Sequence, residues 1–203
     1  MNGGVLLDWL DRFSRHFYPA RHTHLGETGC GHSDCQSSKD GHAHDHDDGR
    51  SEREVLPWLR LSAGLDPQRV ETYVVSAYWL RRELGKVNEA EQFLREGLQA
   101  NPGDCEILFE LGRIQLEARH DPGRARNIWE VALSNWRQQE QPKKEPNVFI
   151  NAQILGQLAR LEEGQKNYAK AVDYLRLLEA VSPHKPQIQK WIEEINVKAK
   201  SWP

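Results

Sequence analysis

Histidine, cysteine and aspartate are concentrated near the N-terminus, where their types and spacing would suit metal binding. Seven of the nine histidines and two of the three cysteines precede residue 54. Neutral imidazole and thiolate are ligands for zinc, nickel and copper. Alternate residues of an extended chain project to the same side, so three histidines spaced by two are placed to converge on one ion. The candidate ligands are Cys30, His32, Cys35, His42, His44 and His46.

This stretch admits three interpretations: a solvated tether, an adaptable transition-metal site, or a defined zinc site built on Cys30 and Cys35 with nearby histidines. Cys30 and Cys35 lie within the spacing of structural zinc ligands, but a second Cys/His pair at finger-like distance is missing from the sequence. A tether needs only the polar composition that residues 19–53 have. The three alternatives stay open at this point.

Composition excludes several classes of protein. The formal net charge of -3 lacks the basic excess of a nucleic-acid binder. The sequence has no apolar run of about 18 residues, so we expect no transmembrane segment in this chain. The start "MNGGVLLDWLDRF" lacks the basic region of a secretory signal, and we therefore expect a cytoplasmic protein. Three cysteines argue against a disulfide scaffold.

Three sections differ in their patterning. In residues 1–18, Leu6, Leu10, Phe13 and Phe17 recur at three- and four-residue steps, which predicts an amphipathic helix packed on the main domain. Residues 19–53 are polar and without periodicity, and we expect a flexible segment. Helical patterns separated by Gly, Pro and Asn fill residues 54–203, with no strand-like alternation.

An internal repeat organises this third section. Small and large apolar residues recur at fixed spacing in three predicted second helices, each preceded by an amphipathic first helix at Gln68–Leu84, Cys105–Ala118 and Val148–Glu163. Two helices cross closely only where one of them presents a small side chain. The recurring positions are Ala90, Leu94, Gly97 and Pro102; Ala125, Trp129 and Ala132; and Ala171, Leu175, Leu178 and Pro183.

Helix, turn, helix and proline at a period of about 34 residues resembles the tetratricopeptide repeat (TPR) family over roughly Leu65 to Pro183. The resemblance implies an all-α, right-handed helical solenoid of about three repeats, with "PQIQKWIEEINVKAK" as a C-terminal capping helix. The stretch "NWRQQEQPKKEPN" lengthens the spacing between the second and third copies. The order "HFYPARHTHL", then a His/Asp-rich insert, then "LPWLRLSAGLDPQRVETYVVSAYWL" resembles a group of bacterial repeat proteins in which a membrane helix is common upstream.

First helices of such repeats line a concave groove, and the resemblance implies a scaffold that binds a protein or peptide partner there. Aromatic and arginine side chains dominate binding hot spots. Exposed Trp79 and Phe109 would form the groove with nearby arginines, unless Trp79 is covered by the N-terminal helix or the insert. The expected partner-binding residues are Val75, Trp79, Arg82, Phe109, Arg113 and Arg160. The pattern does not predict an oligomeric state.

Motifs for catalysis are missing from the sequence: it has no glycine-rich phosphate loop, no nucleophile elbow and no helical histidine pair with a glutamate. His120 and His184 fall in predicted turns. We therefore expect a protein that is not an enzyme and requires no cofactor. The alternative function is transition-metal binding or buffering, with zinc or nickel held by the histidine-rich segment.

Overall fold

A computed structural model describes residues 48–201, with side chains described from residue 57 to residue 200. The predicted N-terminal helix and the candidate metal ligands lie outside the described residues. Nearly all of the described residues belong to the second of the two units into which the chain divides, Glu52–Pro203. Every regular element in the described part is helical, and none of its helices is long and apolar enough to cross a membrane.

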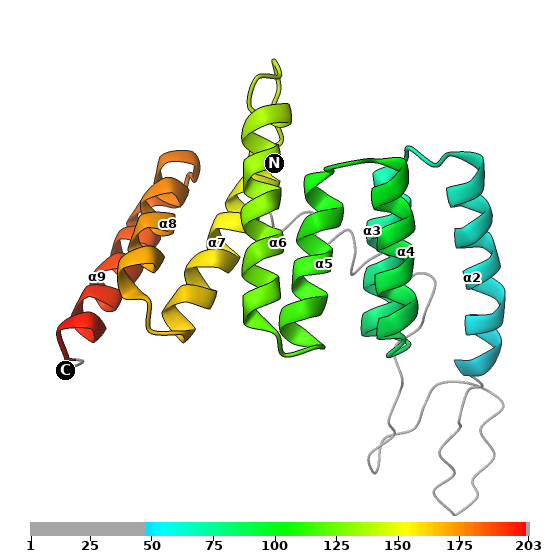
Figure 1. Ribbon diagram of the computed structural model, residues 1–203, viewed down its shortest axis with the longest axis horizontal. Coiled ribbons are helices and arrows are strands. Elements are labelled where there is room, and N and C mark those ends of the chain that lie inside the picture. Colours follow the sequence, from blue (N-terminus) through cyan, green and yellow to red (C-terminus); the bar gives the residue numbers. More distant parts are fainter. Residues whose placement is uncertain (1–47, 202–203) are drawn as a thin grey trace, which may run out of the picture. The chain divides into compact units, whose positions relative to one another are not determined.

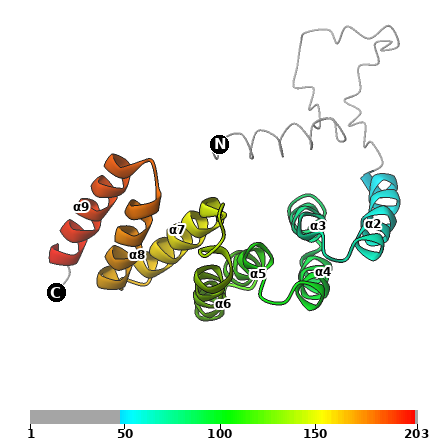
Figure 2. The same ribbon diagram turned by 90° about the horizontal axis from the view of Figure 1, so that it is seen from above.

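Three helix-turn-helix hairpins form the body of this unit. The first helices are α3 (Val70–Arg82), α5 (Cys105–Glu117) and α7 (Val148–Gly164), and their hairpin partners are α4 (Val87–Ala100), α6 (Pro122–Asn135) and α8 (Tyr168–Val181). Figure 2 shows the second helix of each hairpin beside its own first helix. The predicted all-α, TPR-like solenoid of three repeats is confirmed, with helix bounds within two residues of those expected.

Single helices flank the three hairpins (Figure 1). Helix α9 (Lys185–Ser201) follows the last hairpin and packs on α8, as expected of the capping helix. Helix α2 (Asp48–Leu65) precedes the first hairpin. It begins inside the stretch 19–53, so the expectation of a flexible segment up to residue 53 is wrong from Asp48 onward. The charged run at its start follows no apolar period but includes Glu and Arg, which are good helix formers.

Small residues let the helices of a hairpin approach closely. A side chain at Gly97 would overlap the ring of Tyr73, and one at Gly112 would overlap the indole of Trp129. Trp129 is 1% exposed and donates its indole N–H to the carbonyl of Phe109 at 3.0 Å. The largest side chain of α6 is therefore accommodated by the smallest residue of α5.

Short polar residues set where the helices begin. The Asp104 carboxylate accepts hydrogen bonds from the backbone N–H groups of Glu106 and Ile107, each at 2.9 Å, at the start of α5. Asp121 and Asn147 cap α6 and α7 in the same way. The insertion between the second and third repeats continues α6 as a π-helical turn, η1 (Trp136–Glu140), before the loop to α7. Helix caps of this kind contribute about 1 kcal/mol each.

Candidate partner-binding surface

The predicted partner-binding residues all lie on the three first helices, but the structure separates them into exposed and buried sets. We call the solvent-facing side of α3, α5 and α7 the first-helix face. Arg82 on α3 and Arg160 on α7 are exposed there, and Val75 and Trp79 of α3 are half-buried. These four residues keep surface that a partner could contact.

Phe109 is not part of that surface, and the expectation that its ring is exposed is wrong. The residue is 4% exposed and its ring lies 6.3 Å from the ring of Trp129, centroid to centroid. Helix α5 is central in the array, where α3, α4, α6 and α7 all pack against it. A helix with neighbours on both sides buries both edges of its apolar face. The position of a residue within the repeat therefore does not by itself determine whether its side chain is exposed.

Arg113 lies on the first-helix face but is already bound within it. Its guanidinium contacts Glu110 and Glu117 of the same helix, each at 3.1 Å. Burial alone would lower the pKa of Arg113, but attraction to these two carboxylates raises it above its usual value. The residue therefore stays charged and holds the surface of α5 in place.

Arg81 extends this network to the neighbouring repeat. Its side chain is 8% exposed, pairs with Glu117, and lies 3.8 Å from Glu110. Burial alone would raise the pKa of Glu117, but Arg113 and Arg81 together lower it. The spacing of Glu110, Arg113 and Glu117 by three and four residues was visible in the sequence. The arrival of Arg81 from α3 depends on how the repeats pack, and sequence reasoning missed it.

Trp191 of α9 continues the first-helix face beyond α7. The Arg160 guanidinium lies over its indole ring, 5.7 Å from the centroid, which suits a cation–π interaction. The indole N–H of Trp191 donates to Glu163 at 2.8 Å, and Lys198 pairs with the same carboxylate at 2.7 Å. Burial opposes a charged Glu163, but the bonds from Lys198 and Trp191 lower its pKa. The capping helix thus contributes an aromatic side chain next to an exposed arginine.

The N-terminal end of α5 carries carboxylates, in contrast to the arginines elsewhere on the first-helix face. Burial raises the pKa of Asp104, and the nearby Glu140 and Glu71 carboxylates raise it further. Burial also raises the pKa of Glu106, and repulsion from Asp104 is the next largest cause. Asn147 donates to the Glu106 carboxylate at 2.8 Å and ties α7 to α5. The surface therefore has carboxylates near the start of α5 and arginines toward the ends of α3 and α5.

The raised pKa of Asp104 predicts a pH-dependent effect of Asp104→Asn. Asparagine caps a helix as well as aspartate does, so the cap survives. A carboxyl whose folded-state pKa is raised stabilises the fold below its unfolded pKa of about 3.9, and this contribution is lost as pH rises through the folded-state pKa. We expect the variant to gain stability relative to the wild type between pH 4 and pH 7, measured by urea unfolding. A constant difference across that range would contradict the assignment.

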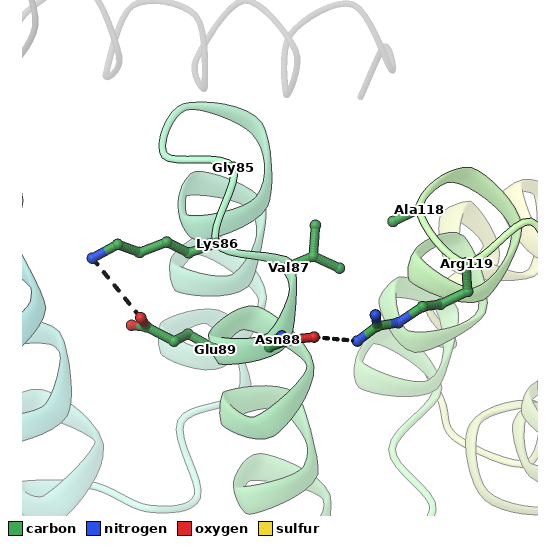
Figure 3. Close-up of a pocket in the computed structure, with 7 residues that line it drawn as sticks. All are labelled: Gly85, Lys86, Val87, Asn88, Glu89, Ala118 and Arg119. Carbon is green, nitrogen blue, oxygen red and sulfur yellow. Dashed lines mark hydrogen bonds and ion pairs between the residues drawn. The ribbon is translucent and has the colours of Figure 1, made fainter.

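A cavity in the described part lies at the turn ends of the first two hairpins (Figure 3). Its volume is about 380 Å³, and residues 85–89 and 118–119 line it. Lys86 lies 3.9 Å from Glu89, while Arg119 donates to Asn88 and pairs with Glu91 at 3.1 Å. Its polar side chains pair with one another, and its lining contains no histidine, serine, threonine or cysteine. This cavity does not resemble a catalytic site.

Metal binding is not supported by the described residues. None of their His, Cys, Asp and Glu side chains forms a group of three or more that could hold a metal ion. The Cys105 thiol is buried, and burial followed by repulsion from Asp104 raises its pKa to about 12, so it is a poor ligand. The six candidate ligands between Cys30 and His46 lie outside the described residues, and their metal site stays a prediction.

The helix-turn-helix hairpins give this chain an all-α, TPR-like fold. No family model matches the chain, and no curated protein matches its sequence. Among solved structures, the chain is similar to the one in the crystal structure of MamA, at 14% sequence identity and a TM-score of 0.48. The similarity covers 77% of this chain and 96% of that chain.

Proposed function

We propose that this protein is a non-enzymatic scaffold that binds a peptide or a helix of a partner protein on the first-helix face. The observation that carries the proposal is the contact of the exposed Arg160 with the Trp191 ring on that face. Arg160 lies over Trp191, and Arg82 follows Trp79 by one turn of α3. Arginine and tryptophan are the residue types most enriched in binding hot spots.

A rigid support strengthens the proposal. The network of Arg81, Glu110, Arg113 and Glu117 joins α3 to α5, and Asn147 joins α7 to Glu106 of α5. Surface side chains held by such contacts lose less conformational freedom when a partner binds. The binding residues of the proposal are Val75, Trp79, Arg82 and Arg160, with Arg113 positioning the surface and Phe109 supporting it from the core.

The test is the affinity of a partner captured by the full chain, measured by calorimetry with single variants. We expect Trp79→Ala, Arg82→Ala and Arg160→Ala each to weaken binding roughly 10- to 30-fold, the effect of losing a hot-spot side chain. Arg124→Ala is the matched control, because that side chain is 75% exposed on the second helix α6. Wild-type affinity in all three variants would overturn the proposed surface.

A further inference from the structure

Glycine inside a helix accompanies close packing in two of the three hairpins. Gly97 of α4 lies against the ring of Tyr73 in α3. Gly112 of α5 lies against the indole of Trp129 in α6. Glycine disfavours a helix more than any residue except proline, so its presence at these two positions is explained by the ring that it admits.

Gly156 lies at the midpoint of α7 and has no such ring against it among the described residues. A Cβ atom added there would meet only the Cδ2 atom of Leu178, at 4.0 Å, which is an ordinary van der Waals contact. The other described glycines without a close neighbour lie in turns or at helix ends, at positions 64, 85, 123 and 164. The packing of the described helices therefore does not explain a glycine in the middle of α7.

The burial pattern shows where Gly156 lies in the repeat. The buried residues of α5 recur at the same spacing in α7, so that Gly112 corresponds to Ala159. Phe109 and Gly156 each lie three residues earlier and are therefore equivalent. Gly156 is half-buried, and Arg160, one turn after it on the same side of α7, is exposed on the first-helix face. The third repeat thus has no side chain at the position where the second has a phenyl ring.

An apolar ring and a cation lie on either side of Gly156 along this side of α7. Phe149, two turns before the glycine, is 39% exposed, and the half-buried Gln153 lies between them. Arg160, one turn after the glycine, contacts the ring of Trp191. The open position and the exposed cation one turn away together favour a large apolar group next to a negative charge, because the charges at a binding surface are complementary.

We propose that Gly156 determines which partners the first-helix face accepts: a helix of the partner crosses α7 at this glycine and places an aromatic side chain on it. The same arrangement exists within the chain, where Trp129 lies on Gly112. A carboxylate about one turn along the partner helix pairs with Arg160, because the two groups have opposite charge. This role of Gly156 rests on the proposed function and adds the chemistry of the partner, which is a helix with an aromatic and an acidic residue one turn apart.

Gly156→Ala separates this role from a structural one. Alanine fits without a clash and favours the helix, so we expect the thermal midpoint of the full chain to rise by about 2 to 4 °C, measured by circular dichroism. Gly112→Ala is the matched control: its side chain overlaps the Trp129 indole, and its midpoint should fall. A fall for Gly156→Ala would show that internal packing needs the glycine, and it would overturn the proposal.

Selection of a phage library of randomised helical peptides against the full chain tests the partner chemistry. We expect the selected peptides to have Trp, Tyr or Phe three or four residues from Asp or Glu. Their dissociation constants, measured by fluorescence anisotropy, should rise at least about 10-fold for Gly156→Leu, which fills the open position, and for Arg160→Gln, with a smaller rise for Gly156→Ala. Ala180→Leu is the control for added bulk, because Ala180 is exposed on the second helix α8, and it should bind the peptides as the wild type does.

A variant on α3 separates the role of Gly156 from the proposed function. Peptides that Trp79→Ala weakens but Gly156→Leu and Gly156→Ala bind with wild-type affinity would overturn only the role of Gly156. Peptides that depend on Gly156 but lack the aromatic and acidic pair would overturn the stated partner chemistry. A library without binders, or peptides unaffected by Trp79→Ala, Arg160→Gln and Gly156→Leu alike, would overturn the proposed function as well.

Discussion

Replacing Trp129 with alanine is expected to lower the free energy of unfolding by about 3 to 5 kcal/mol, the cost of deleting a large buried aromatic side chain. The indole is 1% exposed, fills the space that Gly112 leaves, and donates an additional hydrogen bond to the Phe109 carbonyl. The variant removes the packing and this additional bond. Guanidinium unfolding of the full chain, followed by far-UV circular dichroism, measures the effect.

Val131→Ala is the control for this substitution, because Val131 lies on the same helix and is 51% exposed. Alanine favours a helix more than valine does, so we expect a change within about 0.5 kcal/mol. A loss of less than about 1 kcal/mol in Trp129→Ala would show that the α5–α6 hairpin does not depend on this contact.

Arg126→Leu is expected to cost about 3 to 5 kcal/mol at neutral pH, because it leaves a buried carboxylate without its cation. Glu162 of α7 is fully buried and pairs with Arg126 of α6, whose second nitrogen lies 3.2 Å from the carboxylate. Asn167 also donates to Glu162, at 2.8 Å, and remains in the variant. One neutral donor does not replace the charge of the guanidinium.

The double variant Arg126→Leu, Glu162→Gln separates the lost cation from lost packing. We expect it to recover most of the stability, because an uncharged amide at position 162 needs no counter-ion. Arg176→Leu is the surface control: its pair with Asp173 is 3.9 Å long and both side chains are at least 70% exposed. Such pairs contribute about 0 to 1 kcal/mol. A double variant as unstable as Arg126→Leu would contradict the buried-charge explanation.

Much of the fold was predictable because it depends on local patterns. The spacing of small residues at Ala90, Ala125 and Ala171 predicted three hairpins, and the Gly, Pro and Asn residues between the helical patterns predicted the turns. His120 has a positive φ of 54°, as a residue that ends a helix commonly has. Helix α2 was missed at its start, where the charged residues after Asp48 lack an apolar period.

The candidate surface was predictable only in part. Arg82 and Arg160 are exposed on first helices, and their role in binding stays a prediction. Phe109 is buried and Arg113 is bound to Glu110 and Glu117. Trp191 joined the surface although its helix was expected only to cap the array.

The sequence by itself therefore determined the helices, their pairing into hairpins and the order of the repeats, since these follow from side-chain spacing within about 34 residues. Only the tertiary structure decided which residues remain accessible, because exposure depends on the number of helices that surround each position. It buried Phe109 in the most surrounded helix and left Trp58 exposed on α2. It also brought Arg81 to Glu117 and Arg126 to Glu162, contacts between neighbouring repeats that no local pattern specifies.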